Sequence, residues 1–388
     1  MDQTTAAPDD RFAHWPRFRA RLLLLALALL VIAAALVPIT AGEQDTKTAG
    51  FVENITGAKV AGAERPRDDD LALYDRVIER IGKGENYYEV TAQEHRSSNY
   101  PLRPGVAVRL PTLAYAIMGL GKIAPGETRP DERWPVIATA ILLVLAVLLA
   151  WWRRLGEEPG GLRYRNIGTA LMFLGASLGL NAYYFVLHEL WAGMLLALAF
   201  GLHRPGRKYG AALVVAALAL AIREHALPFV MLLAALAFWR RDWKEGVAWS
   251  ALIAVFLAGL AWHLQLVQAQ VRPSDVMGPD WLLLRGLSGW LSNVVLSSNL
   301  RFLPHFLAGP AVVLMIFGWA GWKSEAGVFA TLLYLGYGLA FMIAGRPDNF
   351  YWGAIIAPAM FVGLAFMPRA AQSLWRSAFP ETTSNSST

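Results

Sequence analysis

The sequence predicts an all-α protein that crosses a membrane through a bundle of about ten transmembrane helices. Two observations carry this prediction. Of the 388 residues, 56% are hydrophobic and only 16% are charged, whereas about 25% of residues are charged in soluble domains. The hydrophobic residues also form blocks without charge, such as Leu22 to Val37 and Trp134 to Trp152, and a helix needs about 20 apolar residues to cross a bilayer.

The sequence contains no cysteine. Disulfides, thiolate metal sites and cysteine nucleophiles are therefore excluded, and any catalysis must use carboxylates, His, Lys, Arg, Tyr or hydroxyls. The net charge of +6 would suit nucleic acid, but basic residues in a membrane protein more commonly set its orientation. We expect membrane lipids among the partners and no nucleic acid.

Residues 1–21 are expected to form a cytoplasmic tail, and residues 22–42 a first span. The tail carries four arginines before the apolar block: Arg11, Arg17, Arg19 and Arg21. The block is long for the core of a signal peptide and suits a retained helix. A cleaved signal peptide that ends near Ala41 is the alternative.

The polar stretch 43–133 is expected to be a large outer loop with juxtamembrane helices, followed by nine spans within residues 134–367. The predicted spans cover residues 134–152, 166–183, 187–203, 209–223, 226–239, 246–264, 304–322, 326–345 and 349–367. Residues 265–303 are expected to form an outer interfacial loop. Residues 368–388 are expected to form a disordered tail. This tail is expected in the cytoplasm, since ten spans return the chain to the side on which it began.

The distribution of basic residues supports this topology, because cytoplasmic loops are enriched in Lys and Arg. The predicted inner turns and tail contain Arg153, Arg154, Arg163, Arg165, Arg204, Arg207, Lys208, Arg240, Arg241, Lys244, Lys323, Arg369 and Arg376. The short outer connections contain only Arg223, Arg272, Arg285, Arg301 and Arg346. We therefore expect a protein of the bacterial inner membrane with both termini in the cytoplasm and the large loop in the periplasm.

Three polar clusters lie at the predicted outer ends of spans, where charged groups are costly and hence informative. They are His188-Glu189, Arg223-Glu224-His225, and Arg346 with Asp348, Asn349, Tyr351 and Trp352. The uncharged runs beside Arg223 are only about 14 residues long, or about 21 Å of helix, so this turn is expected to lie below the outer surface. The alternatives are a capped helical hairpin at Arg223-Glu224 and an interfacial aromatic belt at Tyr351-Trp352.

Residues Trp281 to Arg285 and Trp290 form an apolar, aromatic run that is too interrupted to span. We interpret it as an interfacial segment at the outer leaflet, of the kind that rests against a lipid chain. A plain surface connector explains the sequence equally well.

Within the large loop, Asp68 to Asp70 precede an amphipathic stretch from Leu71 to Ile81, which predicts a helix that ends near Gly84. The simplest interpretation of the acidic residues is an N-cap, since negative charge stabilises a helix N-terminus.

This loop resembles the GT-C membrane glycosyltransferases, including the protein mannosyltransferases and the lipid A aminoarabinose transferases. In those transferases an Asp-Glu pair is followed by an aromatic residue four positions after the Asp and by a Gly about ten positions further on. Asp70, Tyr74 and Gly84 have this spacing, and Pro111-Thr112-Leu113-Ala114-Tyr115 looks like the family's Pro-Leu-Tyr segment. The sequence departs from the family at Leu71, where the family has Glu. The motif similarity is confined to residues 68–115.

The resemblance implies a GT-C-like bundle and an inverting glycosyltransferase that moves a sugar from a polyprenyl-phosphate donor to a lipid, glycan or protein acceptor at the outer face. It implies a catalytic carboxylate at Asp70, either alone or as an Asp69-Asp70 pair, and cations for the donor phosphate at Arg223, Arg346 and Arg96. The expected substrate-binding residues are Tyr74, Tyr88, His95, His188, Glu189, Glu224, His225, Asp348 and Asn349.

Metal dependence stays open at this stage, and no cofactor is certain. Asp68 to Asp70 would suit Mg²⁺ or Mn²⁺, and some GT-C relatives use a divalent cation. Two other functions are also considered: a transporter or flippase of lipid-linked sugars, and an outer-face polymerase or ligase of envelope polysaccharide. Inverted repeats and midplane charges, which are common in transporters, are not detected in the sequence.

Overall fold

A computed structural model describes residues 10–41, 69–126, 129–158, 161–207 and 209–380. The described chain is helical, and its β-structure is limited to two isolated bridges. By length and composition, five helical segments could cross a membrane: Arg17–Leu36, Gly105–Ile123, Trp134–Glu157, Trp243–Gln268 and Glu325–Ile343. A sixth is the bent pair Pro347–Ile355 and Ala357–Ala378. The prediction of an all-α membrane protein is therefore confirmed.

The α-helices are α1 (Arg17–Leu36), α3 (Asp69–Gly82), α4 (Tyr87–Ser97), α5 (Thr112–Ile123), α6 (Trp134–Glu157), α7 (Arg165–Ala176), α8 (His188–Leu202), α9 (Gly210–Ile222), α10 (Leu227–Trp239), α11 (Trp243–Gln268), α12 (Gly286–Leu296), α13 (His305–Gly321), α14 (Glu325–Ile343), α15 (Ala357–Met360) and α16 (Gly363–Ala378). The 3-10 helices are η1 (Gly105–Ala107), η2 (Pro130–Glu132), η3 (Gly161–Tyr164), η4 (Ser177–Leu180), η5 (Ala182–Tyr184), η6 (Glu224–Ala226), η7 (Asn299–Phe302) and η8 (Pro347–Ile355).

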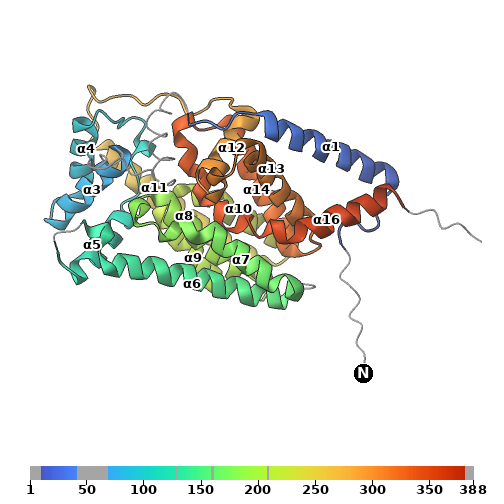
Figure 1. Ribbon diagram of the computed structural model, residues 1–388. Helices are drawn as coiled ribbons and strands as arrows, with labels where there is room; N and C mark the ends of the chain where they lie inside the picture. The colour runs from blue at the N-terminus through green and yellow to red at the C-terminus, as the bar shows by residue number, and fades with distance from the viewer. Residues whose placement is uncertain (1–9, 42–68, 127–128, 159–160, 208, 381–388) are drawn as a thin grey trace, which may run out of the picture.

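The helices of the large loop gather at one end of the bundle. Figure 1 shows α3, α4 and α5 together at this end, with α16 and the N-terminal end of α1 at the opposite end. The helix expected over residues 71–81 is α3, and its apolar residues Leu71, Ile78 and Ile81 are buried against the bundle. The face of α3 that the sequence predicted to be apolar is thus the face that packs against the bundle.

Helix α5 lies within the segment that we assigned to the outer loop, although residues 105–123 have the length and apolarity of a span. The backbone is extended at Val108, between η1 and α5, and α5 itself has 12 residues. A helix of that length covers about 18 Å, short of the hydrocarbon thickness.

The last apolar region is a broken helix. η8 and the helical stretch from Ala357 onward meet at an angle of 65°. Irregular backbone at membrane depth requires protein around it, and here small residues supply close packing. A Cβ atom at Gly193 of α8 would lie 2.1 Å from the carbonyl oxygen of Ala354, and one at Gly353 would lie 1.9 Å from that of Asn293.

One expectation is wrong, and a second is wrong for Trp290. Residues 368–378 are not a disordered tail, because α16 continues through Ala378 and buries Ala370 and Leu374 against Phe12 and Phe317. Within the expected interfacial loop 265–303, Trp290 belongs to the buried helix α12 and is 6% exposed, whereas Leu282 and Leu284 are exposed. The apolar run around Trp290 is short because α12 has only 11 residues. It is apolar because other segments of the protein enclose this helix.

Candidate functional site

Asp70 lies in the first turn of α3 and accepts a hydrogen bond from the hydroxyl of Tyr100. Asp69 opens the same helix, but its side chain lies outside the described part of the chain, as does Asp68. Asp69 and Asp70 thus lie in the first turn of α3, where negative charge is favourable, and Asp70 lies one turn before Tyr74.

Tyr74 connects α3 to the bundle. Its ring packs against the imidazole of His188, with the ring centroids 5.2 Å apart. Burial raises the pKa of the Tyr74 phenol, and four charged side chains act on it: Arg109 and Arg223 oppose the rise, whereas Asp70 and Glu189 add to it. Asp70 therefore shares an electrostatic environment with charged groups of the bundle.

Glu189 and Arg223 form a buried ion pair behind Tyr74. The Nε atom of Arg223 lies 2.7 Å from Oε1 of Glu189, and each side chain is 1% exposed. Arg223 also pairs with the carboxylate of Glu224, and the Nη2 atom of Arg109 lies 3.8 Å from the same Glu189 oxygen. These four residues place two guanidinium groups and two carboxylates together, and charges removed from water require such pairing.

The short helices explain why Arg223 is buried. Helix α9 ends at Ile222, Arg223 has an extended backbone, and α10 begins four residues later at Leu227. Each of these helices has 13 residues, which corresponds to about 20 Å and is less than the hydrocarbon thickness of a bilayer. The Arg223 side chain is thus buried in protein, and the depth of this turn in the membrane stays a prediction.

The third polar cluster joins the same group through hydrogen bonds. Asn349 accepts a bond from the backbone N–H of Arg346 and donates one to the Tyr351 hydroxyl at 3.3 Å. Arg109 donates to that hydroxyl at 3.2 Å. The guanidinium of Arg346 itself pairs with Asp348, with Nη2 and Oδ2 2.8 Å apart.

His225 continues the group on the other side of Arg223. Its Nε2 atom lies 3.7 Å from Oε1 of Glu224, and its ring meets Trp352 edge-on with centroids 4.5 Å apart. The site therefore combines carboxylates, guanidinium groups and aromatic rings. A small cavity beside Tyr74 and His188, also lined by Tyr87 and Thr91, has room for about one water molecule.

Three of the expected site residues have other contacts. The Arg96 Nε atom lies 2.7 Å from Oδ1 of Asp275, and this bond lowers the pKa of Asp275 to about 2. His95 bonds through Nδ1 to the Pro101 carbonyl at 3.0 Å, and burial lowers its pKa to about 4. The Tyr88 hydroxyl lies 3.2 Å from Nδ1 of His263. None of these contacts joins the Glu189–Arg223 group.

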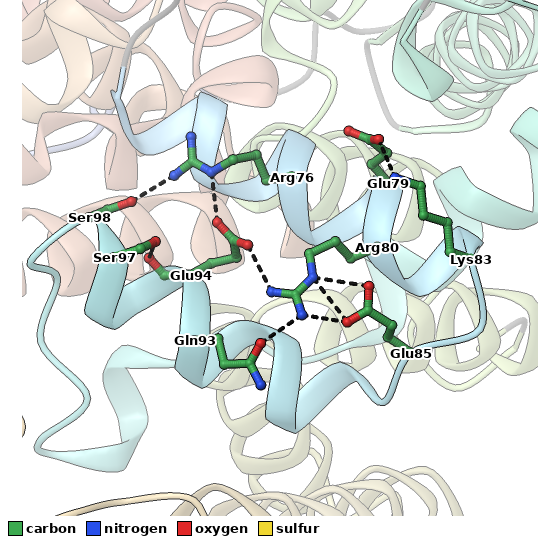
Figure 2. A network of polar contacts seen from close by, with 9 residues as sticks. All are labelled: Arg76, Glu79, Arg80, Lys83, Glu85, Gln93, Glu94, Ser97 and Ser98. Atoms are coloured by element: carbon green, nitrogen blue, oxygen red, sulfur yellow. Dashed lines mark hydrogen bonds and ion pairs between the residues drawn. The ribbon is translucent and has the colours of Figure 1, made fainter.

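A polar network braces α3 against α4 (Figure 2). Glu94 of α4 accepts bonds from Arg76 Nε at 2.7 Å and from Arg80 Nη1 at 2.9 Å, both donors lying on α3. Burial alone would raise the pKa of Glu94, but the two arginines hold it below its ordinary value. The Arg80 Nε atom also donates to Glu85 at 3.1 Å. This network fixes the helix that carries Asp70 and Tyr74.

Arg109 is the site residue that the sequence interpretation missed. It lies in the connection before α5, where the hydroxyl of Tyr87 donates to its backbone carbonyl at 2.8 Å. Its position directly before the Pro111 to Tyr115 segment was the available signal. The sequence alone did not show that this loop folds back onto α8.

The site has donors for an anion but no evident metal centre in its described part. Among the residues that the structure describes, no group of three or more His, Asp or Glu side chains could hold a metal ion. Comparisons with protein-family models, curated proteins and solved structures found no match to this chain.

Proposed function

We propose that this protein is an inverting glycosyltransferase that moves a sugar from a polyprenyl-phosphate donor to an acceptor hydroxyl at the outer face of the membrane. One arrangement carries the proposal: Arg109 and Arg223 both approach the Glu189 carboxylate, and Tyr74, one turn after Asp70 on α3, packs against the adjacent His188. A carboxylate and two guanidinium groups are the chemical groups that this reaction needs.

In the proposed reaction, Asp70 takes the proton from the acceptor hydroxyl while that oxygen forms a bond to the anomeric carbon. The bond from that carbon to the phosphate oxygen breaks, and polyprenyl phosphate leaves with the electron pair. Attack from the opposite side inverts the anomeric configuration. Because phosphate is a stable anion, it needs no general acid, and Arg109 and Arg223 would stabilise its charge in a site of low dielectric.

We revise the set of phosphate ligands expected from the sequence. Arg223 is retained and Arg109 is added, because both guanidinium groups approach Glu189. Arg346 borders the site through Asn349 and Tyr351. Arg96 is bound to Asp275, so we assign it a role in holding the outer loops.

The topology that belongs to this proposal has ten spans in a GT-C-like bundle. It counts α1, α6, α11 and α14, the bent segment from η8 to α16, the four shorter apolar helices and α7. The shorter helices are α8, α9, the η6–α10 segment and α13. In the proposed orientation both termini lie in the bacterial cytoplasm and α3, α4 and α5 face the periplasm, where a lipid-linked donor and an envelope acceptor would meet.

The direct test uses the purified full-length protein in liposomes with radiolabelled polyprenyl-phosphate sugars and extracted envelope lipids or glycans. Transfer of one sugar, with the anomeric configuration inverted, supports the proposal. Movement of the labelled donor across the bilayer without a new glycosidic bond would identify a transporter, and transfer of a preassembled block would identify a ligase or polymerase. Repeating the assay after chelation, with Mg²⁺ or Mn²⁺ added back, determines the metal requirement.

A further inference from the structure

The connection from α11 to α12 contains a short apolar segment, Trp281 to Leu284, that projects from the protein. Leu282 and Leu284 are 81% and 82% exposed, and Leu283 is 48% exposed. In Figure 1 this connection runs along the edge of the molecule. Three consecutive leucines in water would be unfavourable, since each would leave a large apolar surface hydrated.

The backbone of this segment is bonded to the outer end of α14. The N–H of Gly345 donates to the Trp281 carbonyl at 2.8 Å, and the N–H of Arg285 donates to the Met342 carbonyl at 2.8 Å. Leu282 and Ala344 form an antiparallel bridge between these two bonds. Non-helical backbone is tolerated at membrane depth where its polar groups find protein partners, and the two bonds provide them for the Trp281 carbonyl and the Arg285 N–H, at the two ends of the segment.

The leucines continue an exposed apolar face of α14. Leu332, Leu335, Leu339 and Ile343 are all exposed, and their spacing places them on one face of the helix. This face is the one that a membrane-spanning α14 would turn toward acyl chains. Because Leu282 is bridged to Ala344, directly after Ile343, the projecting segment extends the same surface beyond the end of the helix. That continuity identifies lipid as the occupant.

The connection is anchored on its polar side as well. The Nη2 atom of Arg103 donates to the Asp275 carbonyl at 2.7 Å, and Arg96 pairs with the Asp275 carboxylate. Gly278 donates to the Arg103 carbonyl at 2.6 Å. Exposed Asp280 directly precedes Trp281, and Trp side chains favour the headgroup level of a bilayer. The polar stretch around Asp275 and Gly278 is thus bonded to the segment that contains Arg96 and Arg103. The apolar stretch begins at Trp281, a residue type that favours the membrane interface.

We propose that Leu282, Leu283 and Leu284 insert among the acyl chains of the membrane leaflet next to the large loop, as an anchor held by the end of α14. This inference requires a membrane-spanning α14 but does not require glycosyl transfer. The anchor holds the start of η8, because Arg285 also donates to the Arg346 carbonyl at 3.1 Å.

The absence of cysteine from the sequence allows a direct test. Leu282→Cys, Leu284→Cys and, as the aqueous control, Asp280→Cys are each labelled with a nitroxide in the full-length protein. Leu339→Cys provides the lipid-facing reference on α14. The labelled proteins are reconstituted in phosphatidylethanolamine–phosphatidylglycerol liposomes, and collision rates with oxygen and with a water-soluble nickel complex are measured by electron paramagnetic resonance.

We expect the oxygen-to-nickel collision ratio at positions 282 and 284 to match that at 339 and to exceed that at 280 several-fold. A ratio at 282 and 284 equal to that at 280 would place the leucines in water and overturn the inference. Slow label motion with low collision rates for both reagents would show a protein surface, from a second copy or another partner, in place of lipid. A Leu283→Cys label provides a further position should one variant fail to reconstitute.

Discussion

The Nε atom of Arg223 lies 2.7 Å from Oε1 of Glu189, and both side chains are buried to 1% exposure. Glu189 comes from the first turn of α8 and Arg223 from the turn between α9 and η6. The same carboxylate approaches Arg109 from the outer loop. One carboxylate on α8 therefore joins two cations from two other segments, Arg223 from the turn after α9 and Arg109 from the connection before α5.

Removing this carboxylate should destabilise the protein strongly. Glu189→Ala removes the more deeply buried of the two carboxylates that pair with Arg223, the other being Glu224, and loss of one partner of a buried ion pair costs about 3–5 kcal/mol. We expect a large fall in thermal stability in detergent, measured by the unfolding temperature. Glu325→Gln is the control, because Glu325 is exposed at the start of α14 and surface changes cost at most about 0.5 kcal/mol. Equal stability of the two variants would contradict the assigned role of Glu189.

Arg109→Ala should reduce use of the proposed donor. The guanidinium contacts Glu189 and Tyr351, and loss of one well-placed donor to a developing anion lowers rates by about 100-fold or more. Kinetics with varied donor and fixed acceptor should show a higher donor KM and a lower kcat. Arg109→Lys should recover only part of the loss, because it keeps the charge but not the planar fork. An unchanged donor KM in Arg109→Ala would remove Arg109 from the phosphate subsite.

Glu94→Gln should weaken the brace between α3 and α4. Glu94 accepts charged hydrogen bonds from Arg76 and Arg80, and we expect a loss of about 1–2 kcal/mol. Glu79→Gln is the matched control in Figure 2, because Glu79 pairs with Lys83 at 2.7 Å and both side chains are largely exposed. Hydrogen exchange of α3 should rise in Glu94→Gln and not in Glu79→Gln. No change in either variant would mean that the brace contributes nothing to holding α3.

His95 should make stability depend on pH. Burial lowers its pKa from 6.5 to about 4, so between these values the unfolded chain binds more protons than the native state. Stability must therefore fall as the pH falls from about 6.5 to 4, by on the order of 3 kcal/mol for this group. His95→Gln should show a smaller decrease in unfolding temperature over this range than the unsubstituted protein. His305→Gln, at an exposed histidine, should leave the decrease unchanged. The same pH dependence in His95→Gln and the unsubstituted protein would contradict this assignment.

The sequence predicted the helical class because charge-free blocks have few alternatives in a bilayer. It also predicted α3, where Leu71, Ile78 and Ile81 share a face and are buried. It failed at α12 and at α16, whose positions depend on tertiary packing. Pro368 lies inside α16, and the bend before this helix divides one apolar run into separate elements.

The site was predicted in part. The clusters at His188-Glu189 and Arg223-Glu224 were visible because charges at the ends of short apolar runs are costly, and the structure pairs Glu189 with Arg223. Arg109 and Arg96 illustrate the limit. Arg96 lies in the last turn of α4 and Arg109 in the connection before α5, and only the fold shows that Arg109 approaches Glu189 whereas Arg96 pairs with Asp275.

The central claim is that Asp70 is the base of a glycosyl transfer, and the most direct test is the transfer rate of Asp70→Asn in liposomes with saturating donor and acceptor. The amide keeps the shape and can still accept the Tyr100 hydrogen bond, but it cannot take a proton at neutral pH. We expect normal insertion and thermal stability, with transfer reduced at least about 1000-fold. Transfer at near the unsubstituted rate by a correctly folded Asp70→Asn protein would contradict the account.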